Sequence, residues 1–307
     1  MATLKVKNLF KVYKNAKYIS ARDINFEVKE GEIFGFLGVN GAGKSTTIKC
    51  ITGIIPYTAG QVDVCGYDIT NAPHDAKRSF GFVPDNHAVY DKLTGSEYIS
   101  YIASIYKVPK DDFVDRFDNL VKKFNLSHAI NNQISSYSHG MKQKISIIGA
   151  LIHKPKLWIL DEPMVGLDPQ SILDVKNYMK EYAKNGNSVI FSSHNLDTVE
   201  KLCDRAIIIH GGVIIALIDL NEYRQKGLSL EDEFMKLTGQ AKEKNDKTRA
   251  DLLDLEGEWI KQSNKRKAGQ KMASQVLGFA KGEDGVDGQI EAILKRDRFE
   301  FDSKGGN

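Results

Sequence analysis

Residues 38–46, GVNGAGKST, have the composition and spacing of a phosphate-binding loop, and they lie between an apolar run at 33–37 and a helix-like stretch at 45–51. Glycines let backbone N–H groups approach phosphate oxygens, and a helix N-terminus adds a partial positive charge. The pattern predicts that Lys44 contacts the β- and γ-phosphates of a nucleotide and that the Ser45 hydroxyl contacts Mg²⁺. The candidate nucleotide contacts in this loop are Gly38, Asn40, Gly41, Gly43, Lys44, Ser45 and Thr46.

An acidic pair, Asp161 and Glu162, follows the apolar run at residues 157–160. The carboxyl end of a buried parallel strand is where sheets of this kind place their ligands. We expect Asp161 to hold Mg²⁺ through water, and Glu162 to orient and deprotonate the water that attacks the γ-phosphate. With the phosphate loop, the pair predicts hydrolysis of a nucleoside triphosphate.

A second stretch, SSYSHGMKQK at residues 135–144, looks like the polar start of a helix whose apolar positions continue to residue 152. A Ser hydroxyl, a Gly backbone N–H and a helix N-terminus together make an anion-binding site. Ser138 and Gly140 are the candidate contacts. The sequence therefore contains two predicted anion-binding sites, which we call the two anion cradles: residues 38–46 and the helix start at Ser138 and Gly140. A single nucleotide needs only the first.

Hydrophobic periodicity predicts the elements that hold these motifs. Strands are expected at residues 4–10, 23–28, 32–37, 61–64, 80–84, 157–160, 188–192 and 206–209. Residues 96–125 instead repeat apolar side chains at helical spacing. Continuously apolar strands that alternate with helices predict a mainly parallel sheet covered on both faces.

Composition narrows the class of protein. The 307 residues suffice for one large or two modest domains. The formal net charge of +3 is close to balance, so the overall charge does not indicate nucleic-acid binding. Three cysteines, Cys50, Cys65 and Cys203, lie far apart without a Cys-x-x-Cys pair, which indicates a reducing compartment and argues against a metal site built from cysteines. No apolar run approaches the length of a membrane span, and the first residues alternate like a strand and not like a signal peptide. We expect a cytosolic protein that reaches a membrane only through a partner.

Together and in this order, the motifs resemble those of the ATP-binding subunit of an ATP-binding cassette (ABC) transporter, in particular an exporter-type bacterial cassette. The resemblance covers residues from about 4 to 239. Residues 38–46 match the Walker A loop, 138–143 the signature motif, 158–163 the Walker B strand, 166–169 the D-loop and 192–194 the switch histidine. The resemblance implies an α/β fold. Its P-loop NTPase core has a mainly parallel sheet, an N-terminal antiparallel β part and an inserted helical subdomain at about 86–155.

In that family, two cassettes dimerise head to tail, and each nucleotide lies between one subunit's Walker A loop and the other's signature motif. The resemblance therefore implies that Ser138 and Gly140 bind the partner's ATP and that Asp168 makes a contact across the dimer. It implies that Tyr13 stacks on adenine. It also implies that His194 contacts the γ-phosphate and positions the water together with Glu162. ATP would hold the dimer together until hydrolysis removes the phosphate.

Each motif also has a purely structural explanation. The phosphate-loop pattern can arise in a glycine-rich turn, and an acidic pair after a strand is often a helix cap or a solvated turn. His194 could be a hydrogen-bonded core histidine, Asp168 an ordinary turn acid and Tyr13 a core aromatic. The occurrence of all the motifs in the family's order favours the functional interpretation.

Two positions depart from the family pattern. Asp85 stands where most members have Gln; a carboxylate there can still reach Mg²⁺ through water, but it adds negative charge beside a triphosphate. We count Asp85 among the nucleotide and metal contacts and expect it to make hydrolysis depend more on the partner. His139 stands where the signature motif has Gly. Because Ser138 and Gly140 are kept, the His139 side chain is expected to point away from the phosphate.

The sequence thus predicts an ATPase that powers a transporter of the exporter type, with ATP and Mg²⁺ as cofactors. Its expected partners are an integral membrane permease and a second ABC ATPase subunit; no nucleic acid is expected. The chain would lie in the cytoplasm, peripheral to the inner face of the cell membrane. The alternative is a soluble ABC ATPase that serves a non-transport complex.

The predicted domain division falls near residue 239. Residues 1–239 are expected to form the ATPase domain. Residues 240–307 mix charges of both signs with scattered Gly. They form either a solvated, partly disordered tail or a helix that docks on a partner.

Overall fold

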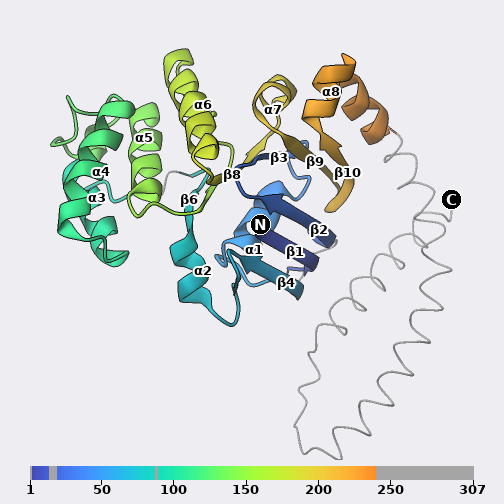
Figure 1. Cartoon of the computed structure of the whole chain (residues 1–307), viewed down its shortest axis with the longest axis horizontal. Coiled ribbons are helices and arrows are strands. Elements are labelled where there is room, and N and C mark those ends of the chain that lie inside the picture. Colours follow the sequence, from blue (N-terminus) through green and yellow to red (C-terminus); the bar gives the residue numbers. More distant parts are fainter. Residues whose placement is uncertain (1, 14–18, 87–88, 240–307) are drawn as a thin grey trace, which may run out of the picture.

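The computed structural model describes residues 2–13, 19–86 and 89–239, which form two sheets with helices around them (Figure 1). The strands are β1 (Ala2–Lys11), β2 (Ala21–Lys29), β3 (Ile33–Leu37), β4 (Ala59–Val64), β5 (Tyr67–Asp68), β6 (Phe80–Val83), β7 (Leu157–Leu160), β8 (Ser188–Ser193), β9 (Arg205–His210) and β10 (Val213–Asp219). The helices are α1 (Lys44–Ile51), α2 (Pro73–Ser79), α3 (Gly95–Ile105), α4 (Lys110–Lys123), η1 (Ile134–Ser136), α5 (His139–Leu151), α6 (Pro169–Lys184), α7 (Leu196–Leu202), α8 (Leu220–Lys226) and a last helix over residues 230–239. The predicted tail, 240–307, lies outside the described residues, so the division at residue 239 stays a prediction.

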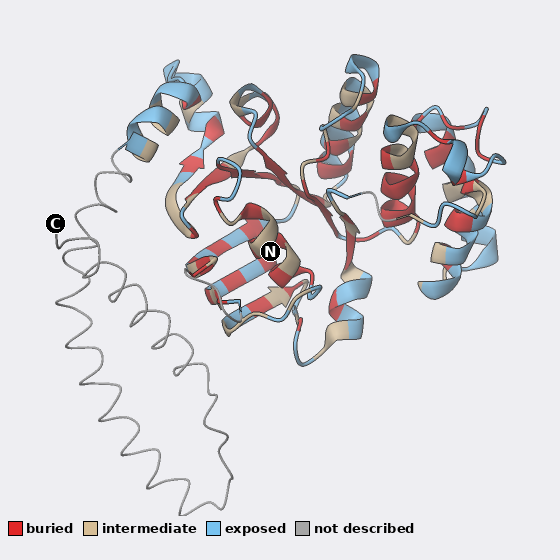
Figure 2. Ribbon diagram, turned by 180° about the vertical axis from the view of Figure 1, so that it is seen from behind, coloured by how far each residue is buried: buried red, intermediate tan, exposed pale blue. Residues whose placement is uncertain are grey.

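The smaller sheet is antiparallel, with strand order β2-β1-β4-β5. Along β1, Leu4 and Val6 are buried while Lys5 and Lys7 are exposed, because successive side chains of a strand point to opposite faces. Figure 2 shows this alternation as stripes of buried and exposed residues. One face of this sheet therefore packs on the core and the other meets solvent.

The larger sheet is mainly parallel, with strand order β10-β9-β3-β8-β7-β6. Strand β3 runs parallel to β8 and β9, and β7 runs parallel to β6 and β8; β10 is an antiparallel edge strand. Every residue of β3, β7 and β8 is buried, as expected for strands covered on both faces. The predicted α/β fold, with its mainly parallel sheet and N-terminal antiparallel part, is confirmed.

The core lies in two layers, one on each face of the parallel sheet. On one face, α1 is sandwiched between the two sheets, with Ile48 and Ile51 in the same buried cluster as Phe34. On the other face, α5, α6 and α7 cover the sheet, and Trp158 shares a buried cluster with Met179. This arrangement leaves the carboxyl ends of the central strands free to carry loops.

The helices α3, α4 and α5 form the predicted helical insert and lie together beyond the edge strand β6 (Figure 1). Helix α3 starts with a capping box, in which the Glu97 carboxylate accepts from the Thr94 N–H at 2.8 Å and the Thr94 hydroxyl oxygen accepts from the Glu97 N–H at 3.2 Å. Helix α5 starts after Ser138, so the insert presents the signature motif at a helix N-terminus.

Most predicted elements are found within a few residues of their expected bounds. The sequence reading missed α2, β5, β10 and α8; α2 and β5 are too short for a clear period, whereas the apolar run of β10 after Gly211 and Gly212 was a usable signal. Among the described residues, no helix combines the length and the apolar character that crossing a membrane requires.

Candidate functional site

The phosphate loop joins β3 to α1. Gly43, directly before α1, has a φ of 108°, a left-handed conformation that favours glycine. A Cβ at this position would lie 2.7 Å from the backbone oxygen of Ser20. The close approach of this neighbouring backbone explains why the loop needs glycine here.

Lys44 lies buried beneath this loop, with only 5% of its surface exposed. Its ammonium group donates to the backbone oxygens of Gly38 at 2.7 Å and Val39 at 3.3 Å. The same Nζ lies 3.3 Å from Oε1 of Glu162. Lys44 therefore places its ammonium group at the loop and next to the predicted catalytic acid.

Asp161 is fully buried at the end of β7. Its Oδ1 accepts hydrogen bonds from the hydroxyls of Ser45 at 3.1 Å and Ser192 at 2.6 Å. Burial raises the pKa of Asp161 above its ordinary value, and the two serine hydrogen bonds act in the opposite direction. Its Oδ2 has no hydrogen-bond partner among the described residues. A buried carboxylate oxygen without a partner, next to a hydroxyl, fits a hard divalent cation such as Mg²⁺.

Glu162 follows directly and is held from two sides. Its Oε2 lies 3.1 Å from Nδ1 of His194, while Oε1 faces Lys44. Its backbone has a φ of 48°, and its N–H donates to the Ser192 hydroxyl at 2.8 Å. These contacts fix the carboxylate at the carboxyl ends of β7 and β8, where it can act on a molecule bound at the loop.

A cavity of about 690 Å³ lies beside the phosphate loop, and Asp161, Ser192 and His194 are not among the residues that line it. Its walls include Tyr13, Asp85 and Glu162 together with residues 40–46 of the phosphate loop. The Tyr13 ring is 40% exposed, and the Lys11 ammonium lies 4.8 Å from its centroid. A cation next to the ring orients it while leaving the ring accessible for stacking. The structure thus brings the predicted loop, acid and aromatic residues to one place.

The signature residues form a separate group. Ser138, Gly140 and Asp168 are absent from the walls of the phosphate-loop cavity. The Ser138 hydroxyl oxygen accepts from the Met141 N–H at 3.3 Å and so caps α5. Asp168 caps α6 by accepting from the side chain and the N–H of Ser171, and these hydrogen bonds lower the pKa of Asp168. Within one chain, the two predicted anion cradles therefore do not share a binding site.

Sequence reasoning missed several residues of the site. Ser192 bridges the two acids, since it donates to Asp161 and accepts from the backbone of Glu162. Arg22 and the Gly211–Gly212 turn line the cavity as well. A serine at the end of a buried strand was a weak signal, whereas nothing local pointed to Arg22.

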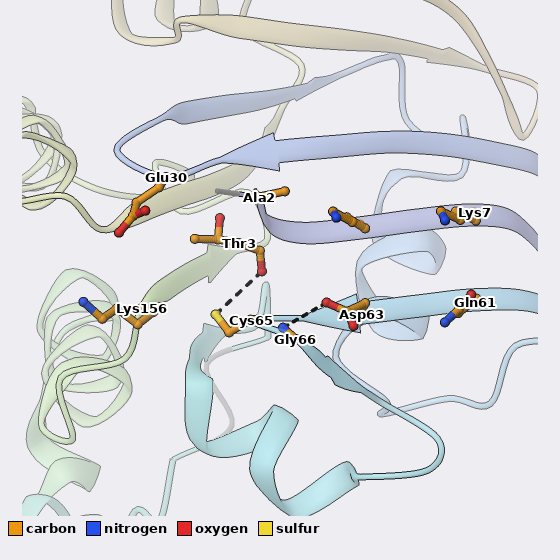
Figure 3. A pocket seen from close by; sticks show the side chains of 10 residues that line it. Ala2, Thr3, Lys7, Glu30, Gln61, Asp63, Cys65, Gly66 and Lys156 are labelled. Atoms are coloured by element: carbon orange, nitrogen blue, oxygen red, sulfur yellow. Dashed lines mark hydrogen bonds between the residues drawn. The ribbon is translucent and has the colours of Figure 1, made fainter.

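A second cavity, of about 640 Å³, lies at the exposed face of the small sheet (Figure 3). It shares no lining residue with the phosphate-loop cavity. In the strand register Lys5 lies opposite Asp63 on one side and Glu27 on the other, so the basic side chain faces acids across the sheet. Burial raises the pKa of the Cys65 thiol, which disfavours the reactive thiolate. The hollow is lined by three lysines and two acids, which are of mixed charge, and we assign it no chemistry.

Comparison with known proteins matches residues 21–165 to the family model described as "ABC transporter". The linearmycin resistance ATP-binding protein LnrL of Bacillus subtilis (strain 168) is 39% identical over 214 residues, which cover 70% of this chain and 68% of that protein. The bacitracin transport ATP-binding protein BcrA of Bacillus licheniformis is 36% identical over 224 residues, covering 73% of this chain and 72% of that protein.

A solved structure described as the ATP-binding subunit of an ABC transporter has the same fold. It superimposes with a TM-score of 0.72 at 34% identity, and the match covers 77% of this chain and 99% of that one.

Proposed function

The chain belongs to the family of ATP-binding subunits of ABC transporters, which are ATPases, and we propose that it hydrolyses MgATP to drive export through a separate membrane permease. The observation that carries the proposed site is the position of Glu162, whose two carboxylate oxygens face Lys44 and His194. All three lie at the phosphate-loop edge of the sheet.

The proposed roles follow from these contacts. Residues 38–46 bind the phosphates through backbone N–H groups, and Lys44 adds its charge. Glu162 takes a proton from the attacking water, and His194, which is 55% exposed, contacts the γ-phosphate and holds the carboxylate in place. Tyr13 stacks on the adenine.

The donor set also fits a metal. Ser45 and Asp161 would hold Mg²⁺, with Asp85 near enough to act through water, since the charge of Asp85 already contributes to the raised pKa of Asp161. When bound, the ion would neutralise negative charge that develops on the phosphates during hydrolysis.

Asp161→Asn is expected to raise the melting temperature of the nucleotide-free protein at neutral pH and to remove the further rise caused by MgATP. The pKa of Asp161 is raised in the folded state, so its contribution to stability is present at acidic pH and is lost as the pH rises through that pKa. The uncharged side chain avoids this loss. The advantage of the variant should therefore shrink towards about pH 4, near the ordinary pKa of Asp.

Thermal unfolding with and without MgATP, compared with wild type at both pH values, measures both effects. If the variant is less stable than wild type at neutral pH, the buried charge of Asp161 does not destabilise the folded protein as argued. A variant that still responds to MgATP would remove Asp161 from the metal site.

We further propose a head-to-tail dimer. Cassettes of this family dimerise and pair with membrane components. Ser138 and Gly140 lie outside their own chain's cavity, yet Ser138 sits at the N-terminus of a 13-residue helix, where an anion is favourable. A second subunit that places its phosphate loop there would complete both sites.

The names of similar proteins support export, since one is named for linearmycin resistance and another for bacitracin transport. The membrane partner is tested by expressing the tagged chain in its own host and purifying it from detergent-solubilised membranes. We expect it to be recovered together with a polytopic subunit. Stable recovery with soluble proteins alone would overturn the transport proposal and favour a soluble ABC ATPase.

A further inference from the structure

The imidazole of His139 lies against the backbone of Gly166. Gly166 has a φ of 75°, and a Cβ at this position would lie 2.5 Å from Cδ2 and 2.6 Å from Nε2 of His139. At these distances a side chain at residue 166 and the His139 ring cannot both keep their present positions, so one of them would have to shift. The ring therefore occupies the space beside the D-loop glycine.

Two further contacts join the same segments. The Gln143 side chain, which is only 1% exposed, donates to the backbone oxygen of Pro163 at 3.2 Å. A Cβ at Gly140 would lie 3.5 Å from Cδ2 of Leu167, an ordinary van der Waals distance. The first turns of α5 thus pack along residues 163–168, which we call the 163–168 turn.

The 163–168 turn is directly connected to Glu162. The Val165 N–H donates to the backbone oxygen of Glu162 at 3.3 Å, and the turn ends at Asp168, the cap of α6. A shift of the turn would therefore move the backbone that aims the Glu162 carboxylate. The buried Gln143 side chain holds this turn to α5 from below, whereas His139 and Gly166 are both exposed and meet at the surface.

We propose that His139 is a positioning residue that fixes the 163–168 turn to the signature helix α5. In the dimer, Ser138 faces the nucleotide bound by the partner, and Glu162 faces the nucleotide bound by its own chain. His139 therefore links nucleotide binding at one site to the orientation of the Glu162 carboxylate at the other. The inference rests on the proposed function. It depends on the His139 ring, because a glycine at position 139 has no ring to make the contact.

A double-mutant cycle tests the contact. Gly166→Ala is expected to lower kcat. Adding His139→Gly should raise kcat about tenfold above that of the Gly166→Ala variant, because this second substitution removes the ring that the new methyl group meets. Gly186→Ala is the matched control: Gly186 has a φ of 81° but no atom within 4 Å of a Cβ, so it carries the backbone strain without the clash. His139→Gly should give no recovery with Gly186→Ala.

A second measurement keeps the proposal testable if Gly166→Ala fails to fold. His139→Gly alone should lower kcat and the Hill coefficient for ATP, while the Kd for ADP stays at the wild-type value. His74→Gly, at an exposed histidine in the first turn of α2, controls for glycine at a helix start and should leave all three unchanged.

The outcomes separate the two proposals. Additive effects in the cycle, or an unchanged Hill coefficient and kcat in His139→Gly, would overturn the role of His139. The proposed function would still stand if the wild-type enzyme hydrolyses ATP cooperatively. A wild-type protein that neither hydrolyses ATP nor dimerises with it would overturn both.

Discussion

Glu162→Gln is expected to slow ATP hydrolysis by about a hundredfold to ten-thousandfold, the usual contribution of a general base, while ATP still binds. Glutamine has nearly the same shape, so it keeps an oxygen near Lys44, but it cannot take a proton from water. With hydrolysis blocked, both halves of each composite site should keep their hold on the γ-phosphate. The variant should therefore change from monomer to dimer when MgATP is added.

Phosphate release measures the rate, and light scattering with and without MgATP measures the mass. Glu231→Gln, an exposed acid in the last described helix, is the control and should behave as wild type. Hydrolysis at the wild-type rate would exclude Glu162 as the base. A variant that binds MgATP and stays monomeric would contradict the proposal that this chain forms the head-to-tail dimer without its membrane partner.

Lys44→Ala is expected to weaken ATP binding by about tenfold to a hundredfold, because hydrogen bonds to charged groups contribute about 1.5–3 kcal/mol. The ammonium group is buried and already aimed at the loop through Gly38 and Val39, so no other side chain replaces it without rearrangement. The loss should be large for ATP and ADP and small for adenosine, which has no phosphate.

Fluorescence titration with labelled nucleotides and with adenosine as competitor measures this difference. Lys7→Ala removes an exposed lysine of the same charge from the outer face of β1 and should leave all affinities unchanged. Equal weakening for adenosine and ATP would indicate a distorted cavity and would contradict a direct phosphate contact by Lys44.

Both predictions concern contacts between residues that are far apart in the chain. Ser45 and Asp161 are 116 positions apart, yet they are hydrogen-bonded. The strand order explains this proximity: β8 lies between β3 and β7, and all three are parallel, so their carboxyl ends share one edge. Ser192, at the end of β8, falls between the phosphate loop and the acids for the same reason.

The sequence by itself determined the motifs, the fold class and the family resemblance. A phosphate loop consists of consecutive residues between a strand and a helix, and a buried strand is a run of consecutive apolar residues. Both can therefore be predicted from a short stretch of sequence. The same holds for the signature stretch, whose Ser138 is a helix cap in the structure as its residue types predict.

Only the tertiary structure decided which side chains meet. The bridge by Ser192, the Lys44–Glu162 pair, Arg22 in the cavity wall and the packing of His139 on Gly166 join segments from different elements. The hydrophobic pattern sets which face of each element is buried, but it does not set the order of strands in a sheet or the placement of an inserted helix on a neighbouring turn. The strand order and the placement of the helix depend on the packing of the whole chain. They determine how the Glu162 carboxylate is oriented.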